Sequence, residues 1–405
     1  MGKEKDPPMD GPCGESPAKR QRKASGEIAQ KRTKVVVRVP ATSANLGPGF
    51  DAVGMAVDIW NEISVERAPE FSIAVEGEGK TLIPTTVTGE GASKHLVVLA
   101  LKKAFEYAGE VPMPPVRVVT RNMVPICSGF GSSSSAIVGG LIAGLVLAGK
   151  ELKVRDFDQQ GKETFAPEEL LHIATEIEGH PDNVAPAIYG GIQLSVVFHE
   201  DLDHGVPVSV MSRRVPHPAG LRLVAYVPSE EARLGSGLDK TEEMRNLLKP
   251  MVPRQDAVVN IQRTALLIDA LHRGDLSSLR FATRDRLHQP IRGDKKFHHL
   301  QTLVRAALGA GAHGAFLSGA GPTIMAICSG ASGDIFAQRS AERQEGAVVQ
   351  AMQSALDALP PEQFKIWGQG KFYIVSPTSM GAHVVSAEPG FSDGIASFGS
   401  LDGML

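Results

Sequence analysis

The run Pro125-Ile-Cys-Ser-Gly-Phe-Gly-Ser-Ser-Ser-Ser-Ala136 combines spaced glycines with four consecutive serines. Glycines leave backbone N–H groups open to a ligand, serines supply hydroxyls, and the N-terminus of the helix expected to follow adds positive potential. One or two serines would be enough to cap a helix. We therefore interpret this run as a site for an oligophosphate rather than as an ordinary serine-rich cap.

Acidic residues follow the helix expected over Leu170–Glu178. Glu178 and Asp182, with Asn183, form an acidic turn there. Mg²⁺ takes one or two carboxylate oxygens and completes its shell with water and phosphate, so this turn would suit the metal if it lies beside the phosphate loop. Taken alone, the turn is more typical of a helix end. The histidines nearby, His172 and His180, show no metal-ligand spacing.

Two arginines stand in polar contexts, Arg245 in Thr241-Glu-Glu-Met-Arg and Arg292 in His288-Gln-Pro-Ile-Arg. By default each is a surface arginine. If both reach one pocket, their planar guanidinium groups would suit a carboxylate substrate. A second glycine-rich turn, Ser318–Thr323, follows an expected strand and could be only a tight connection.

Two other glycine motifs are rejected as nucleotide sites. Gly309-Ala-Gly-Ala-His-Gly314 fits G-x-G-x-x-G, but it follows an expected helix and precedes a strand, the reverse of a dinucleotide-binding turn. Gly235-Ser-Gly-Leu-Asp-Lys-Thr241 lacks the glycine that directly precedes the lysine of a Walker A loop.

The elements that must position these segments are mixed strands and helices in two units, with a boundary near residues 200–220. Alternating or β-branched runs predict strands, and apolar residues at helical spacing predict helices. The expected strands are 34–39, 52–57, 63–66, 71–75, 116–120, 190–197, 221–227, 315–317 and 372–375. The expected helices are 93–106, 136–148, 170–178, 241–248, 256–271, 297–308 and 347–359.

Composition narrows the class of protein. The chain has 405 residues, is 42% hydrophobic and carries a formal net charge of −3, which fits a globular protein of two domains and gives no reason to expect nucleic-acid or membrane binding. Three scattered cysteines argue against a disulfide framework or a zinc site. No apolar run is long enough to span a bilayer and no secretory signal is evident, so we expect a cytoplasmic protein, with plastid or nucleus left open.

Four motifs, in this order, resemble the GHMP family of small-molecule kinases: Pro40–Asp51, the phosphate loop, Glu178–Ala187 and Ser318–Thr323. Within that family, Asn-Leu-Gly-Pro-Gly-Phe-Asp, His-Pro-Asp-Asn-Val-Ala-Pro and His-Gln-Pro-Ile-Arg are similar to the homoserine kinases. The resemblance spans roughly residues 34–386. It implies an α+β fold with an N-terminal ATP-binding domain like ribosomal protein S5 domain 2 over 34–215 and a ferredoxin-like C-terminal domain over 216–386. Outside these we expect a disordered basic tail at 1–33 and a Gly/Ser-rich tail at 387–405.

The resemblance also implies a reaction: Mg²⁺-dependent transfer of the γ-phosphoryl group of ATP to the side-chain hydroxyl of L-homoserine. The Mg²⁺ ligands would be Ser133 or Ser134 and Glu178, with Glu176 as the alternative carboxylate. The residues expected to bind ATP are Pro125, Ser128, Gly129, Phe130, Gly131, Ser132, Ser133, Ser134, Ser135 and Ala136.

For the substrate, the resemblance assigns Asn45, Asp51 and Asn183 to the amino and hydroxyl end of homoserine. Arg245 and Arg292 would hold its carboxylate, Thr241 would lie near the transferring phosphoryl group, and Gly319 would border the substrate. Asp51 or Asp182 is a candidate base only if it reaches the hydroxyl. No dedicated base is expected, because the hydroxyl proton can pass to a phosphate oxygen. A homodimer is a possible state for this family.

The chain departs from the family pattern at three places. Phe130 replaces the usual leucine, Cys127-Ser128 replaces Ala/Arg-Gly, and His95 stands where asparagine is common at an adenosine-proximal position. The last change leaves the nucleotide preference open. The alternatives to a homoserine kinase are a related kinase acting on mevalonate or a sugar, and a non-catalytic regulator that binds ATP or an amino acid. A nucleic-acid protein using the basic cluster at 19–23 is a more distant alternative.

Overall fold

The computed structural model describes residues 32–86, 95–150, 167–199, 210–235, 240–329 and 344–389, together with the backbone of 396–397. The strands are β1 (Lys34–Ala44), β2 (Val53–Arg67), β3 (Ser72–Gly77), β4 (Val116–Asn122), β5 (Ile192–Val197), β6 (Val210–Val215), β7 (Leu221–Pro228), β8 (Gly314–Leu317), β9 (Ile324–Ser329), β10 (Gly370–Val375), β11 (His383–Glu388) and β12 (Ala396–Ser397). The helices are α2 (Leu96–Tyr107), α3 (Ser132–Leu147), α4 (Pro167–Glu178), α5 (Pro181–Tyr189), α6 (Glu230–Leu234), α7 (Lys240–Asn246), α8 (Arg254–Arg273), α9 (Leu279–Ala282), α10 (Gln289–Lys295), α11 (Leu300–Gly309), α12 (Gln344–Asp357) and α13 (Pro361–Trp367), with a 3₁₀ turn at Leu276–Ser278.

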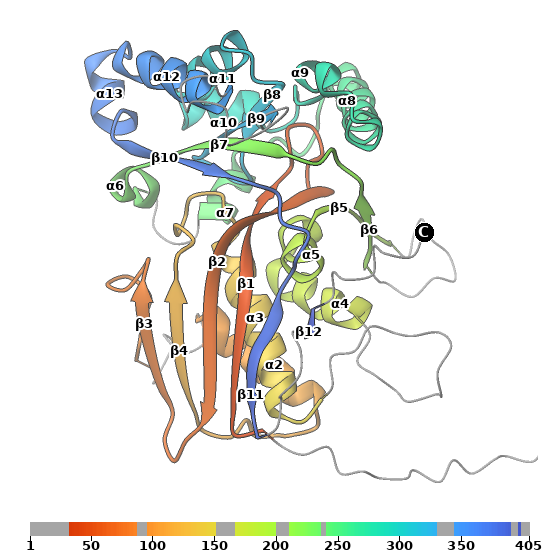
Figure 1. Cartoon of the computed structure of the whole chain (residues 1–405), viewed down its shortest axis with the longest axis vertical. Coiled ribbons are helices and arrows are strands. Elements are labelled where there is room, and N and C mark those ends of the chain that lie inside the picture. The colour runs from red at the N-terminus through yellow and green to blue at the C-terminus, as the bar shows by residue number, and fades with distance from the viewer. Residues whose placement is uncertain are drawn as a thin grey trace, which may run out of the picture. The chain divides into compact units, whose positions relative to one another are not determined.

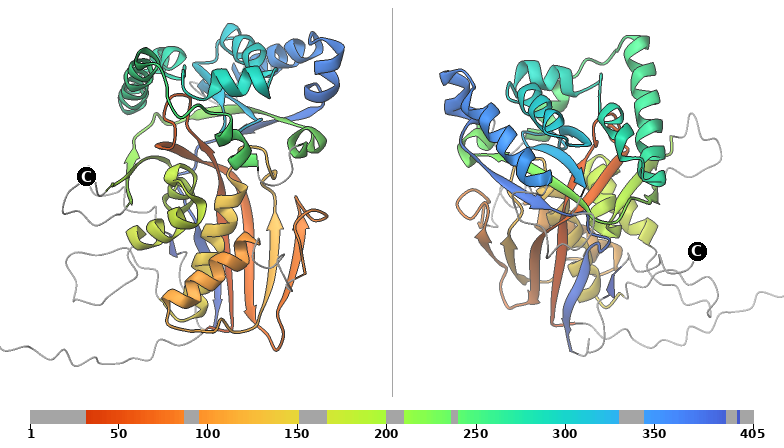
Figure 2. Two further views of the ribbon diagram at one scale, coloured as in Figure 1. Left: turned by 180° about the vertical axis from the view of Figure 1, so that it is seen from behind. Right: turned by 45° about the horizontal axis from the view of Figure 1, so that its top comes forward.

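The larger sheet is built mostly from the first half of the chain. Its strands follow the order β12-β11-β1-β2-β4-β3, and β5 joins β2 where that long strand bends, with β6 beside β5. All pairs are antiparallel except β3 with β4. Helices α2, α3, α4 and α5 lie on one face of this sheet (Figures 1 and 2). Strand β11 comes from the end of the chain and pairs with β1, so the two ends of the described chain meet in one sheet.

The alternating pattern of β1 explains how this face is buried. Val35, Val37 and Val39 have no exposed surface and pack against the apolar residues of α3, including Ile137 and Leu141. Each fully buried side chain of this size contributes roughly 1.5–3 kcal/mol of transfer free energy. The covered face of the sheet therefore fixes the register of β1 and the position of α3, whose N-terminus carries the serine run.

The smaller sheet follows the order β10-β7-β9-β8. Strand β7 lies inside it and separates two cores. Leu223 and Ala225 face a cluster that also holds α8, whereas Val224 and Tyr226 face a cluster with α11 and α12. The period of two along β7 thus buries both of its faces.

One apolar cluster is shared by residues of both sheets. Met55 of β2, Phe130 of the serine run and Ile192 of β5 pack in the same cluster as Leu223 of β7 and Phe316 of β8. Strands expected to belong to separate domains are therefore joined through a common core. The boundaries predicted at 215 and 386 stay predictions. Of the predicted tails, the structure describes only residues 32–33, residues 387–389 with the end of β11, and the backbone of β12.

Helix α3 begins four residues before the predicted start at Ala136, so the prediction of a serine loop up to Ser135 is wrong. Serine often competes with a helix by bonding to its own backbone. Here Ser133 and Ser134 donate to Glu178, and the hydroxyl of Ser135 accepts from Asn61. Because these side chains bond to other residues, they do not compete for the backbone of the helix, and the first turn of α3 forms at the serines.

The expected acidic turn at 178–183 is also wrong in part, because a second helix, α5, begins at Pro181. Proline is favoured in the first turn, where its missing N–H would have no helical acceptor. The interior Pro186 disguised this helix in the sequence. Asp182 and Asn183 thus sit in a helical first turn, and the carbonyl of Asp182 lies so close to Gly54 that a Cβ there would be 1.6 Å from it.

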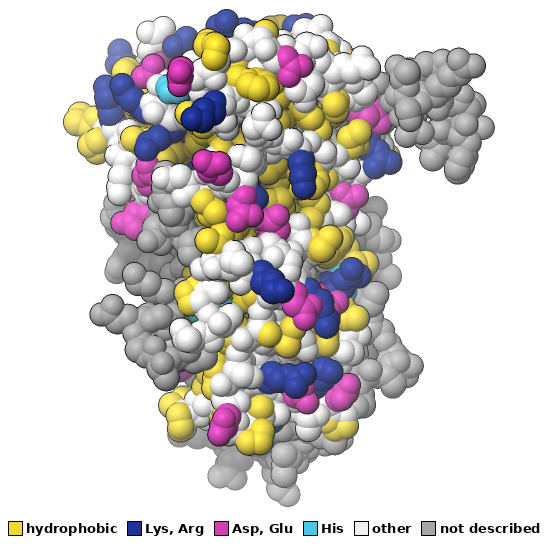
Figure 3. Space-filling view, turned by 90° about the vertical axis from the view of Figure 1, so that its left-hand side faces the viewer, with side chains coloured by type: hydrophobic (Ala, Val, Ile, Leu, Met, Phe, Trp, Pro, Cys, Tyr) yellow, Lys and Arg dark blue, Asp and Glu magenta, His cyan; other side chains and the backbone are white. Residues whose placement is uncertain are grey.

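The exposed strand face carries mixed charges. Arg121 pairs with Glu62 at 2.6 Å and with Glu76 at 2.9 Å across neighbouring strands. In Figure 3 basic and acidic side chains lie among one another on this side. Among the described residues, no helix has both the length and the apolar character needed to cross a membrane.

Candidate active site

A cavity of about 290 Å³ lies where the phosphate loop, the start of α5, the β1–β2 loop and the Ser318–Thr323 turn meet. The β1–β2 loop supplies Asn45 and Asp51, both at positive φ (70° and 57°). Non-glycine residues adopt this conformation at a cost and keep it when their surroundings impose it, often at functional sites. The Asp51 N–H donates to Asn45 Oδ1 at 3.1 Å, which holds the loop in this shape.

The serine run presents most of its expected ATP-binding residues to the cavity. Those that line it are Ser128, Gly129, Gly131, Ser132, Ser133, Ser135 and Ala136. Pro125, Phe130 and Ser134 are buried behind this lining. Gly131 has φ 63°, and a Cβ there would lie 1.9 Å from Thr42 Oγ1, so only glycine fits between the loop and β1. The loop therefore places backbone N–H groups and hydroxyls along one wall.

Glu178 faces the first turn of α3 from the end of α4. Ser133 Oγ and Ser134 Oγ donate to Glu178 Oε1 at 2.7 and 2.8 Å. Burial raises the pKa of Glu178, although the charge of His180 and the two hydroxyls oppose this shift. The alternative carboxylate, Glu176, does not line the cavity; its side chain is 58% exposed and faces His172. The oxygen donors around Glu178 are of the kind Mg²⁺ takes.

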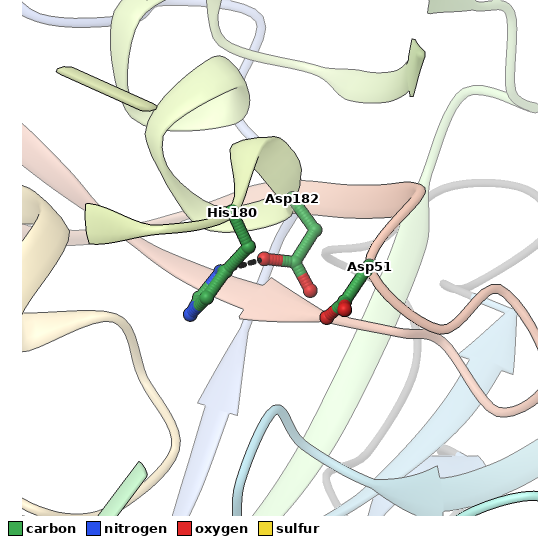
Figure 4. A group of neighbouring side chains, drawn as sticks. All are labelled: Asp51, His180 and Asp182. Atoms are coloured by element: carbon green, nitrogen blue, oxygen red, sulfur yellow. Dashed lines mark hydrogen bonds and ion pairs between the residues drawn. The ribbon is translucent and has the colours of Figure 1, made fainter. Parts of the chain in front are cut away.

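Asp51, His180 and Asp182 point toward one another (Figure 4), each with a potential ligand atom within 4.8 Å of the others. His180 Nδ1 lies 2.6 Å from Asp182 Oδ1, and its buried Nε2 has no partner among the described residues. Burial opposes the charged ring, but Asp182 and Glu178 outweigh it and raise the pKa of His180. A metal ion would have to compete here with Arg245 for Asp51, so this group suits a metal less well than Glu178.

Arg245 grips Asp51 through both carboxylate oxygens, with Nη1–Oδ2 at 3.0 Å and Nη2–Oδ1 at 2.6 Å. The two predicted arginines do converge. The Phe50 ring has Arg245 at 5.5 Å and Arg292 at 5.6 Å from its centre, and both side chains line the cavity. An aromatic face favours nearby cations. Phe50 thus keeps two like charges within one pocket.

Arg292 is buried and poorly neutralised. It donates from Nη1 to Gly319 O at 3.1 Å and to His288 Nδ1 at 3.2 Å, while its Nε has no partner in the part of the chain that the structure describes. Burial, followed by the like charge of Arg245, lowers the pKa of Arg292 to about 10. Burial also lowers the pKa of His288, whose Nε2 lies 2.8 Å from Gly47 O. A neutral His288 donating from Nε2 leaves Nδ1 as the acceptor for Arg292.

The remaining predicted residues lie at the same cavity. Asn45 Nδ2 donates to Gly319 O at 3.2 Å, so Gly319 is held from both sides by Asn45 and Arg292. Thr42 donates to Asn183 Oδ1 at 2.8 Å, which orients the Asn183 amide. Thr241 lines the cavity at the second residue of α7. The structure thus gathers Asn45, Asp51, Asp182, Asn183, Thr241, Arg245, Arg292 and Gly319 into one place, while their roles stay predictions.

Sequence reasoning missed several residues of this cavity, among them Phe50, His180 and Lys240. Phe50 and His180 stand inside the quoted motifs, next to residues that were assigned roles. Lys240 directly precedes Thr241, in a segment dismissed only because it is not a Walker A loop. His95 also lines the cavity, and within the described residues neither of its buried ring nitrogens has a partner.

Comparisons with known proteins show the family of the chain. The family model for the GHMP kinases N terminal domain matches residues 95–191, and that for the GHMP kinases C terminal region matches 267–358. A homoserine kinase from Desulfitobacterium hafniense is 37% identical over 351 residues, covering 87% of this chain and 100% of the relative. A homoserine kinase from Carboxydothermus hydrogenoformans is 38% identical over 294 residues, covering 72% of this chain and 84% of the relative.

Solved structures agree on the fold. The crystal structure of a homoserine kinase from Cytophaga hutchinsonii superposes with a TM-score of 0.66 at 24% identity, covering 88% of this chain and 98% of that chain. The predicted α+β fold of two GHMP kinase domains is confirmed. The chain therefore belongs to the GHMP kinases, within their homoserine kinase branch.

Proposed function

We propose that the chain transfers the γ-phosphoryl group of Mg-ATP to the side-chain hydroxyl of L-homoserine and so forms O-phospho-L-homoserine, a step of threonine biosynthesis. The observation that supports an amino acid as the substrate is the ion pair between Asp51 and Arg245, which lies in the same cavity as the phosphate loop. The α-ammonium and α-carboxylate of an amino acid can replace the partners of this pair one for one. Arg292 adds a second cation for the carboxylate.

In this reading the triphosphate lies along the loop, with its oxygens facing the N–H groups and hydroxyls of Gly129–Ser135. Glu178 with Ser133 and Ser134 would hold Mg²⁺, which neutralises charge on the phosphate oxygens when bound. Asn45, Asp51 and Asn183 would hold the amino and hydroxyl end of the substrate. Thr241 would stand near the transferring group.

The reaction needs little covalent chemistry from the protein. Phosphoryl transfer passes through a loose transition state, so that alignment and charge neutralisation do most of the work. Asp51 is engaged by Arg245 and Asp182 by His180, so neither carboxylate is a free base. The hydroxyl proton then passes to a phosphate oxygen, and no dedicated base is required.

The rival substrates are mevalonate and sugars. Neither carries an ammonium group. If Arg245 bound a substrate carboxylate or otherwise left Asp51, neither compound could supply a new cationic partner for Asp51. The Asp51 side chain is 34% exposed, so a partner lost there is replaced only in part by water, and this is unfavourable. The zwitterion therefore fits better than either rival.

The test is coupled ADP release with Mg-ATP, comparing L-homoserine with L-threonine, L-serine, mevalonate and galactose. We expect turnover selective for L-homoserine. Turnover of mevalonate or galactose would contradict the substrate argument and keep the phosphate loop. ATP binding without turnover of any of them would favour a regulator.

For the oligomeric state and the cellular location of the protein, we propose a homodimer and a cytoplasmic location. Sedimentation of the purified chain and cell fractionation test them, and a monomer or an organelle fraction would contradict them.

A further inference from the structure

Every carbonyl group of the phosphate loop from residue 125 to 131 has a hydrogen-bond donor, and five of the seven donors come from other segments of the chain. From residue 125 to 131 each carbonyl accepts a hydrogen bond, in order from Ser128 Oγ, Arg233 Nη1, Lys240 Nζ, Thr323 N, Ser318 Oγ, Thr42 N and Ser135 N. Within the described residues, the N–H groups of Gly129, Gly131 and Ser132 have no acceptor. The loop therefore keeps its negative dipole ends outward and its positive ends free for an anion.

Two of these donors are buried cations from α6 and α7. Arg233 and Lys240 are each only 5% exposed. Arg233 donates to Ile126 O and, at 3.2 Å, to Glu78, while Glu78 accepts the Ile126 N–H at 3.4 Å. Lys240 donates to Cys127 O at 3.3 Å and to Arg233 O at 3.0 Å. The two cations thus hold the consecutive carbonyls of Ile126 and Cys127.

The hydrogen bonds to these two carbonyls act on the backbone of Cys127. Its φ is 51°, in the left-handed region that a non-glycine residue adopts at a cost of roughly 1–2 kcal/mol. Such a conformation persists when its surroundings impose it. Here the carbonyls before and after the strained φ angle are both held by a cation, so the turn that opens the phosphate wall depends on α6 and α7.

The charges around Lys240 leave it incompletely neutralised. In the described part of the chain its ammonium has two carbonyl partners and the Phe297 ring at 5.4 Å, but no carboxylate at ion-pair distance. Glu78 is shared with Arg233, and Glu243 pairs with Lys296 at 2.5 Å. Burial lowers the pKa of Lys240 to about 8, with Cys127 and Glu243 opposing the shift and Arg233 and Lys296 adding to it.

We propose that Lys240 and Arg233 are positioning residues of the phosphate loop. They hold the Ile126 and Cys127 carbonyls away from the nucleotide, and Lys240 adds a positive charge that favours a triphosphate over a monophosphate. This inference rests on the proposed function in placing ATP at the loop. It goes further by making the affinity for the triphosphate depend on a lysine outside the loop.

The test compares the variants Lys240→Met, Lys240→Arg and Arg233→Met with Lys249→Met, an exposed lysine nearby on the same segment. Calorimetry measures binding of Mg-ATP, tripolyphosphate and AMP, and kinetics measure both KM values. We expect K240M to weaken Mg-ATP and tripolyphosphate roughly tenfold, with AMP and the homoserine KM changed less than twofold. K240R should restore most of the affinity, R233M should resemble K240M, and K249M should resemble the wild type.

The pH dependence separates a charge effect from a purely structural one. The wild type should bind tripolyphosphate more weakly as pH rises from 7 to 9.5, and K240M should lack this slope. The slope should remain in Cys127→Ser, which removes the neighbouring thiol. Unchanged tripolyphosphate affinity in K240M, or equal losses for AMP and homoserine with a lower Tm, would overturn the proposal. If the wild type shows no homoserine-dependent ADP release, the proposed function fails, yet the tripolyphosphate measurements still decide the role of Lys240.

Discussion

At the scale of single residues, three carboxylates of the cavity each have a protein partner that a ligand can replace. Asp51 is bound by Arg245, Asp182 by His180, and Glu178 by two serine hydroxyls. An unpaired buried charge is costly, so each group needs a partner while the cavity holds no substrate. Binding then exchanges one partner for another instead of creating a new charge. This explains how three carboxylates can lie in one small cavity.

A matched pair of variants, Glu178→Gln and Glu176→Gln, tests which of the two carboxylates binds Mg²⁺. The first removes a partly buried carboxylate facing Ser133 and Ser134, and the second an exposed one two residues away on α4. We expect E178Q to lower kcat/KM roughly 100- to 1,000-fold and to need more Mg²⁺, since metal ligands contribute several kcal/mol. E176Q should stay within twofold. Equal losses in both variants, measured by ADP release over a Mg²⁺ titration, would contradict this assignment.

Arg292→Met should act on the amino-acid substrate alone. Truncating one partner of a desolvated charge pair costs about 2–5 kcal/mol, so the KM for L-homoserine should rise roughly 100-fold while that for ATP changes little. The exposed Arg284→Met serves as the control. The analogue 3-aminopropan-1-ol lacks the carboxylate, and its turnover should fall far less in R292M than that of homoserine. Equal losses for both compounds would show that Arg292 does not act on the carboxylate.

At the scale of elements, α3 can reach the phosphate site only because it packs closely on α2. Gly140 and Gly144 face Ala100 and Ala104, and a Cβ on them would lie 2.8 and 2.6 Å from those methyl carbons. Real Cβ atoms do not approach so closely. The two glycines, one turn apart, therefore set the distance between the helices.

We expect Gly144→Leu to lower the free energy of unfolding by about 3 kcal/mol, because overpacking a tight contact forces side chains and backbone apart. Gly309→Leu is the matched control, since a Cβ at that helical glycine meets nothing within 4 Å. Urea unfolding measures both, and the control should change by less than about 0.5 kcal/mol. A G144L variant as stable as the wild type would mean that the α2–α3 contact has room to spare.

Sequence patterns predicted the elements better than their ends and contacts. The strand at 34–39 and the helix at 170–178 followed from alternation and helical spacing, because burial of one face imposes those periods. The start of α3 and the existence of α5 could not be predicted, because they depend on Glu178 accepting from serines and on Pro181 opening a helix. The convergence of Arg245 and Arg292 followed from family motifs. The role of Lys240 depends on where α7 packs, and nothing in its neighbouring residues indicates that.

At the scale of the whole molecule, the phosphate loop is a meeting point of distant segments. Its carbonyls are held by β1 through Thr42, by α6 and α7 through Arg233 and Lys240, and by the 318–323 turn through Ser318 and Thr323. Phe130 of the same loop is buried in the core shared by both sheets. If the loop binds the nucleotide as proposed, binding and the packing of the two sheets are expected to be coupled, and a change in one should be measurable in the other.

Through Lys240, a rise in pH should change the free energy of unfolding and the affinity for tripolyphosphate in opposite directions. Its pKa is about 8 in the folded chain, against 10.5 for an ordinary lysine. Between these values the unfolded chain keeps a proton that the folded chain has lost, so Lys240 makes the free energy of unfolding rise with pH. In the same window the ammonium that favours the triphosphate disappears, so affinity for tripolyphosphate falls. Bound tripolyphosphate should restore the proton, and binding near pH 8.5 should take up protons from the buffer.

The measurement compares wild type with Lys240→Met by urea unfolding at pH values from 7 to 9.5. Other groups titrate in both proteins, so only the difference in unfolding free energy is used. That difference should shift in favour of the wild type as pH rises, while the wild type's advantage in binding tripolyphosphate shrinks. Parallel unfolding curves would mean that the Lys240 pKa is not lowered by burial. If stability and affinity both rose with pH, the charge would not act on the phosphate site.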